Sequence, residues 1–128
     1  MSGMRRFLIV DDNPDGRFVV SKTLLRTFPD AIVQECQNSD TALAIVREEP
    51  LDAVLSHRTA EVEGLVLIRL LRDVNPTIPI IMFSGIDRTA DAAAAGATRF
   101  LDYSEWLNTG KIVAEILGVT PALSTLRP

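Results

Sequence analysis

The chain has very few of the residues that build disulfide-rich or metal-stabilised folds. It contains one cysteine, Cys36, and one histidine, His57, in 128 residues. A single thiol cannot form an internal disulfide, and one cysteine with one histidine cannot complete a structural zinc site. These absences exclude a disulfide scaffold and a zinc-binding domain, and they suit a reducing cytoplasm.

Basic residues and long apolar runs are also scarce. The 13 Lys and Arg residues, of which only Lys22 and Lys111 are lysines, face 17 Asp and Glu residues, so the formal net charge is −4. This balance argues against a nucleic-acid-binding surface. No stretch approaches the ~20 apolar residues of a membrane span, and the N-terminus turns acidic too early for a signal peptide. We therefore expect a cytoplasmic protein without nucleic-acid or membrane partners.

The residues that are present describe one α/β domain. Hydrophobic residues make up 47% of the chain, and short β-branched runs alternate with longer segments of helical period. Such alternation predicts a doubly wound sheet of five parallel strands, with its functional crevice beyond the carboxyl ends of the strands. We expect the domain at 1–118 and a tail at 119–128. Strands are expected at about 7–10, 31–35, 53–56, 79–83 and 99–101, and helices at about 14–28, 38–47, 64–73, 89–95 and 108–117.

The predicted strand ends carry polar residues in a characteristic order. Asp11 and Asp12 follow the first strand, Ser84 ends the fourth, and Phe100 lies in the fifth. With the segments around them, these residues resemble the receiver domain of bacterial two-component response regulators over about 4–117. The resemblance implies a flavodoxin-like (βα)5 fold with strand order 2-1-3-4-5. It also implies that Ser84 and Phe100 are the family's switch pair.

Receivers transfer a phosphoryl group to an aspartate at the end of the third strand. The acidic pair holds magnesium, and a lysine at the end of the fifth strand neutralises charge in the transition state. In this chain the acceptor position falls on Ser56 when counted from Gly64, and on His57 when counted from Asp52. The spacing to Ser84 favours Ser56. Neither residue is a carboxylate, so the resemblance predicts a degenerate receiver.

The lysine position is also substituted. It falls on Tyr103, and Ser104 stands where the family has proline. A cis peptide is therefore not expected there, because a non-proline cis bond costs ~3 kcal/mol. Tyr103 and Trp106 either belong to an interaction surface or cap the edge of the sheet.

Each candidate residue also has a structural interpretation. Asp11 and Asp12 are expected to hold magnesium weakly at most, because the third carboxylate is missing. Without a lysine the pair should repel itself and raise the pKa of one member, unless Arg58 or Arg88 compensates. Ser56 is expected to fill the vacated acceptor site and to hydrogen-bond nearby, because it lacks a general base.

These observations favour a phosphorylation-independent protein-interaction module, not an enzyme, whose partner is a histidine kinase or an output protein. The alternative is a phosphoacceptor receiver that uses Ser56 or a neighbour such as His57. A flavodoxin-like enzyme or nucleotide binder is disfavoured, since no glycine-rich phosphate loop follows the first strand. The resemblance also allows a homodimer, although the short fourth helix alters the surface through which receivers pair.

Overall fold

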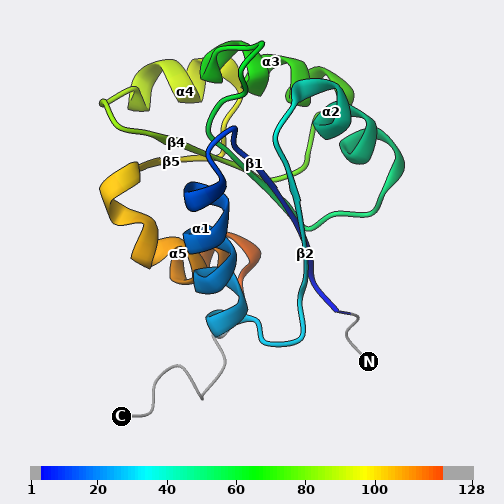
Figure 1. The fold of residues 1–128 in the computed structure, drawn as a ribbon, viewed down its shortest axis with the longest axis vertical. Helices are drawn as coiled ribbons and strands as arrows, with labels where there is room; N and C mark the ends of the chain where they lie inside the picture. Colours follow the sequence, from blue (N-terminus) through cyan, green and yellow to red (C-terminus); the bar gives the residue numbers. More distant parts are fainter. Residues whose placement is uncertain (1–3, 120–128) are drawn as a thin grey trace.

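A computed structural model describes residues 4–119, in which a parallel sheet is covered by helices on both faces (Figure 1). The strand order is β2-β1-β3-β4-β5, which confirms the predicted topology. The strands are β1 (Arg6–Val10), β2 (Ile32–Cys36), β3 (Ala53–Ser56), β4 (Ile80–Ser84) and β5 (Arg99–Asp102).

The helices alternate with the strands as predicted. Helices α2, α3 and α4 cover one face of the sheet, and α1 and α5 cover the other (Figure 1). One element was not predicted, the 3-10 helix η1 that leads from β5 into α5. The helices are α1 (Pro14–Thr27), α2 (Ser39–Glu48), α3 (Gly64–Val74), α4 (Thr89–Ala95), η1 (Tyr103–Asn108) and α5 (Thr109–Leu117).

Local sequence explains where α1 begins and why β1 stops. The side chain of Asn13 accepts a hydrogen bond from the Asp15 backbone N–H, and Pro14 occupies the first helical turn, where its missing N–H costs nothing. The turn between Val10 and α1 therefore leaves Asp11 and Asp12 directly at the carboxyl end of the sheet.

The core has two layers, one on each face of the sheet. Side chains alternate between the faces along each strand, so Val54 faces α2 and α3 while Leu55 faces α1 and α5. Both residues are at most 1% exposed. This alternation determines toward which face of the sheet the side chain of each residue at the end of a strand points.

Helix α5 packs closely against α1 because Gly110 has no side chain. A Cβ at Gly110 would lie 2.8 Å from the Cβ of Thr27 and 2.9 Å from the carbonyl oxygen of Thr23. The same contact brings η1 alongside α1.

Three sequence expectations concern the backbone as a whole. Peptide bonds in the described residues are all trans, including the one before Ser104. None of the described helices is long and apolar enough to cross a membrane. The predicted tail at 119–128 lies outside the described residues except for Val119.

Candidate functional site

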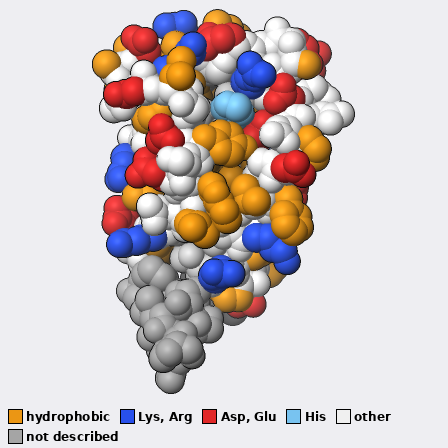
Figure 2. Space-filling model, turned by 60° about the vertical axis from the view of Figure 1, so that its left-hand side comes forward, with side chains coloured by type: hydrophobic (Ala, Val, Ile, Leu, Met, Phe, Trp, Pro, Cys, Tyr) orange, Lys and Arg blue, Asp and Glu red, His pale blue; other side chains and the backbone are white. Residues whose placement is uncertain are grey.

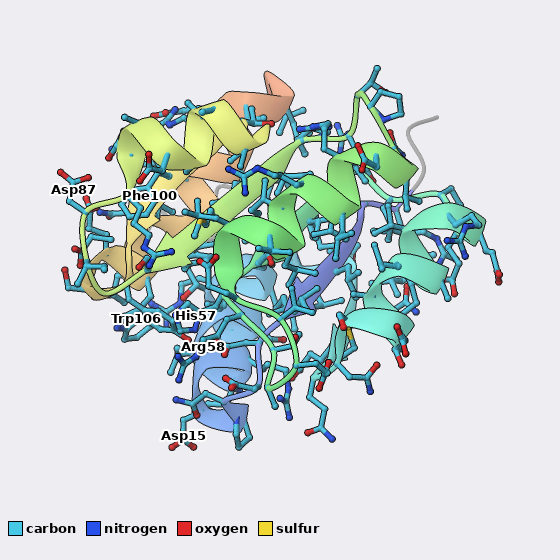
Figure 3. The ribbon with its side chains drawn as sticks, turned by 90° about the horizontal axis from the view of Figure 1, so that it is seen from above. Asp15, His57, Arg58, Asp87, Phe100 and Trp106 are labelled. Atoms are coloured by element: carbon cyan, nitrogen blue, oxygen red, sulfur yellow. The ribbon has the colours of Figure 1, made fainter. Side chains whose placement is uncertain are left out.

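The carboxyl ends of four strands bring polar side chains to one end of the sheet. Asp11 follows β1, His57 follows β3, Ser84 ends β4, and Tyr103 follows β5. Figure 3 views the molecule from the side of α2, α3 and α4, and there His57 lies beside Arg58. The site therefore forms where a doubly wound sheet is expected to carry its function.

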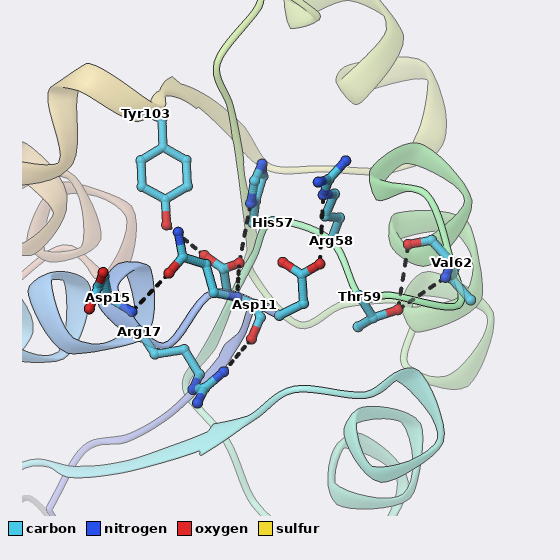
Figure 4. A network of polar contacts seen from close by, with 10 residues as sticks. Asp11, Asp15, Arg17, His57, Arg58, Thr59, Val62 and Tyr103 are labelled. Carbon is cyan, nitrogen blue, oxygen red and sulfur yellow. Dashed lines mark hydrogen bonds and ion pairs between the residues drawn. The ribbon is translucent and has the colours of Figure 1, made fainter.

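Asp11 is the centre of the polar network in Figure 4. The residue is 3% exposed, and each carboxylate oxygen has a partner. Oδ2 accepts a hydrogen bond of 2.5 Å from the Tyr103 hydroxyl. Oδ1 accepts one of 3.0 Å from the Asn13 backbone N–H and lies 3.3 Å from Nδ1 of His57. The carbonyl oxygen of Asp11 accepts a bond of 2.7 Å from Arg17.

These contacts keep Asp11 ionised in spite of its burial. Burial alone would raise its pKa, but the bonds from His57, Tyr103 and the Asn13 backbone outweigh it and hold the pKa below the ordinary value of 3.8. The prediction that repulsion between Asp11 and Asp12 raises the pKa of one of them is therefore wrong for Asp11. Burial and the bond to Asp11 raise the pKa of Tyr103, so its hydroxyl stays protonated and remains a donor.

Tyr103 reaches Asp11 because Gly16 leaves room for its hydroxyl. A Cβ at position 16 would overlap that hydroxyl and lie 2.5 Å from Oδ2 of Asp11. The Tyr103 ring also packs edge-on against His57, with 4.9 Å between centroids, and against Phe83 at 5.7 Å. The phenol is thus fixed from three sides.

The structure distinguishes the two residues that compete for the acceptor position. Ser56 is fully buried on the face of Val54, and its Oγ has no hydrogen-bond partner among the described residues. The hydrogen bond expected for Ser56 is therefore absent. The backbone N–H of His57 bonds to the carbonyl oxygen of Val10 at 2.9 Å, and the imidazole turns to the side of Asp11. Of the two, His57 is the one that lies in the acidic site.

Of the two arginines expected to compensate the acidic pair, one lies beside it. Nε of Arg58 lies 3.8 Å from Oδ2 of Asp12, where a cation that compensates the charge of the acidic pair is expected. Arg88 instead pairs with Glu63, which also caps α3. The compensating cation at the acidic pair is therefore Arg58.

Within residues 4–119, Asp11, Asp12 and His57 form a group that could ligate a metal. One ligand atom from each lies within 4.8 Å of the others. Magnesium prefers oxygen ligands and gives up its waters reluctantly. Here an imidazole stands in place of a third oxygen donor, both oxygens of Asp11 are engaged, and Arg58 competes for Asp12. This set therefore offers magnesium fewer free oxygen ligands than it prefers.

The site opens into a pocket of about 570 Å³. The pocket is bounded by the loops after β1, β3 and β4 and by the first residue of η1. Its polar lining includes Asn13, His57, Arg58, Glu63, Ser84 and Arg88. Tyr103 and His57 separate the Asp11 carboxylate from this space, so the buried charge is held by protein donors and not presented to a ligand.

The predicted switch residues lie on neighbouring strands. Met82 is paired with Phe100 and Ser84 with Asp102, so Ser84 and Phe100 are diagonal neighbours on one face of the sheet. Oγ of Ser84 accepts a bond of 3.3 Å from the Ile86 backbone N–H. Phe100 packs against the core layer of α2, α3 and α4, as expected for a core residue.

Sequence reasoning missed the contact that organises the site. Tyr103 stands at the lysine position, but its bond to Asp11 was not predicted. Trp106 lines a groove together with residues of α1. The available signal was Gly16, because a glycine inside a helix costs ~1 kcal/mol relative to alanine and often marks a close approach.

Comparisons with known proteins agree with the fold. The family model for the response regulator receiver domain matches residues 7–104. The transcriptional regulatory protein ZraR of Salmonella typhimurium is 34% identical over 98 residues, which cover 73% of this chain and 22% of that protein. ZraR of Klebsiella oxytoca is 30% identical over 105 residues, covering 79% and 24%. The chain thus spans under a quarter of the length of these relatives.

Solved structures share the architecture. A mutant receiver domain of the Arabidopsis thaliana histidine kinase CKI1 has a TM-score of 0.76 at 26% identity, over 89% of this chain and 90% of that one. A LuxR-family two-component response regulator from Aurantimonas sp. has a TM-score of 0.79 at 24% identity, over 91% and 86%. The second likeness concerns the fold alone. With its sheet order, its acidic pair at the end of β1 and the match of residues 7–104, the chain belongs to the response regulator receiver domain family.

Proposed function

We propose that this chain is a degenerate receiver that works as a protein-interaction module without aspartyl phosphorylation. The observation that carries the proposal is the closed network around Asp11. The Tyr103 hydroxyl and the His57 imidazole contact the two carboxylate oxygens of Asp11. The family's mechanism needs a lysine and an acceptor aspartate in the places of these two residues.

The chemistry of transfer supports this proposal. An aspartate acceptor attacks as an anion, and the charge that develops on the phosphoryl oxygens must be neutralised by a metal and a cation. A neutral phenol at position 103 provides no such cation. We further propose that Asp11 and Asp12 bind magnesium weakly at most, because protein donors already hold their oxygens.

The remaining parts of the proposal follow from the family. Receiver domains are signalling modules that interact with histidine kinases and output domains. We propose a signalling partner of this kind in the cytoplasm, a role without catalysis, a domain at 1–118, and neither nucleic acid nor membrane as a partner. A homodimer is a further proposal, which sedimentation tests.

A phosphoacceptor is the second candidate, and the Asp11–His57 contact favours His57 over Ser56 as its nucleophile. A carboxylate beside one imidazole nitrogen can orient the ring, and here Oδ1 of Asp11 lies 3.3 Å from Nδ1 of His57. Ser56 has no such base, since its hydroxyl is buried on the other face of the sheet. Phosphohistidine and aspartyl phosphate differ in stability in acid and base, so the site of any adduct can be assigned.

We expect the protein to remain unmodified when incubated with acetyl phosphate or phosphoramidate and magnesium. The missing acceptor and the missing lysine predict that intact-mass spectrometry finds no stoichiometric phosphoryl adduct. A receiver with a complete acidic site serves as the positive control. An adduct mapped to Asp11, Asp12, Ser56 or His57 would overturn the proposal.

A further inference from the structure

A groove between α1 and η1 lies away from the acidic site. Its volume is about 310 Å³, and it is lined by α1, the end of η1 and the start of α5. Phe18 is 59% exposed and Leu107 is 64% exposed, and both border the groove with Trp106. Figure 2 shows apolar side chains gathered on one face of the molecule, with lysine and arginine side chains beside them. Large apolar side chains exposed together mark interaction sites.

The charge of the groove is opposite to that of the whole chain. Lys22, Arg26 and Lys111 line it, and its described lining contains no carboxylate. Both lysines of the chain are in this set, although the formal net charge is −4. Nζ of Lys22 lies 5.5 Å from the centre of the Phe18 ring, which holds the cation at the apolar edge. The groove therefore suits a ligand with an apolar face and negative flanks.

The spacing of these residues indicates the shape of that ligand. Phe18, Lys22 and Arg26 follow one another at intervals of four residues, so they form a row along one side of α1. At ~1.5 Å per residue the row is ~12 Å long, which matches about two turns of a second helix. The cavity beside the row has room for a bulky side chain.

We propose that this groove binds an acidic amphipathic helix of a partner protein, with a leucine or aromatic side chain inserted beside Trp106 and carboxylates against Lys22, Arg26 and Lys111. This surface gives the interaction module of the proposed function its binding site, and the inference rests on that function. A lipid surface fits less well, because the groove is concave and has fewer cations than the four to eight typical of lipid-binding clusters.

The test uses the whole chain and its single tryptophan. Trp106 lines the groove, so its emission reports occupancy directly. The probe is a helical peptide of about 16 residues, with leucine and phenylalanine on one face and glutamate on the flanks. A matched peptide carries lysine in place of each glutamate. We expect the acidic peptide to change Trp106 emission with micromolar affinity and the basic peptide to bind at least tenfold more weakly.

Variants assign the binding to the groove. Lys22→Glu and Lys111→Glu should each weaken acidic-peptide binding about tenfold, and Phe18→Ser should weaken it more. Arg69→Glu is the matched control, because Arg69 is an exposed cation on α3, across the sheet, and should leave binding unchanged. Circular dichroism verifies that each variant is folded.

Several outcomes would overturn the inference. They are no response to the acidic peptide up to about 1 mM, equal binding of the basic peptide, tighter binding to phosphatidylglycerol vesicles, or a dimer that Phe18→Ser dissociates. The assay contains no phosphodonor. If the peptide does not bind and the mass assay finds no phosphoryl adduct, the groove proposal is rejected and the proposed function stands. If the peptide binds but the protein also becomes phosphorylated, the proposed function is rejected and the groove proposal stands.

Discussion

Replacing Gly16 with alanine is expected to lower the free energy of unfolding by about 3 kcal/mol. The added methyl group would overlap the Tyr103 hydroxyl and lie 2.5 Å from Oδ2 of Asp11, so the phenol must move and the buried carboxylate loses a donor. Helix propensity alone would make alanine more stable than glycine by ~1 kcal/mol. The predicted change in the free energy of unfolding therefore has the opposite sign to the one that helix propensity gives. Urea denaturation measures the change.

Two comparisons separate this steric effect from a general effect of substitution. Gly85→Ala is the matched control, because no atom lies within 4 Å of the added methyl group. In a Tyr103→Phe background the overlap with the hydroxyl is gone, and the cost of Gly16→Ala should fall to about 1 kcal/mol. Equal costs in the two backgrounds would show that Gly16 does not make room for the phenol.

Tyr103→Phe alone is expected to cost about 2 kcal/mol at pH 7, because it removes a hydrogen bond to a buried charge. The effect depends on pH. Tyr103 helps to hold the pKa of Asp11 below 3.8, so its contribution is present above the unfolded pKa and is lost as the pH falls through the folded pKa. Denaturation curves should therefore differ at pH 7 and converge once the pH falls below the lowered pKa of Asp11 in the folded protein. A difference that persists in acid would mean that the phenol stabilises the fold by packing alone.

The fold was predictable because its signals are local and repeated. The apolar run before Asp11, the proline that starts α1 and the glycine that ends α4 each define an element boundary without tertiary information. Strand order followed from the resemblance, because alternation of strands and helices does not by itself choose an order. The 3-10 helix η1 was missed since its capping by Asp102 and Glu105 has no strong periodic signal.

The residues of the site could be predicted from the sequence, but the contacts between them could not. The sequence placed Asp11, His57 and Tyr103 at strand ends, but counting from Gly64 and from Asp52 gave two registers for the acceptor. A shift of one residue moves a side chain to the opposite face of a sheet, so the choice needed three-dimensional pairing. The lowered pKa of Asp11 likewise depends on donors from three separate segments, which no local pattern reveals.

The central claim is that substitution of the acceptor and the lysine, and not a change of fold, has removed phosphoryl transfer. The double variant His57→Asp with Tyr103→Lys restores both groups in the same backbone, and His57→Asn with Tyr103→Lys is its control without a nucleophile. The most direct measurement is the intact mass of each protein after incubation with acetyl phosphate and magnesium. We expect a phosphoryl adduct on the restored variant alone, and we expect alkali to remove it, because an aspartyl phosphate hydrolyses in alkali whereas phosphohistidine survives. An adduct on the unsubstituted protein, or none on a folded restored variant, would contradict the central claim.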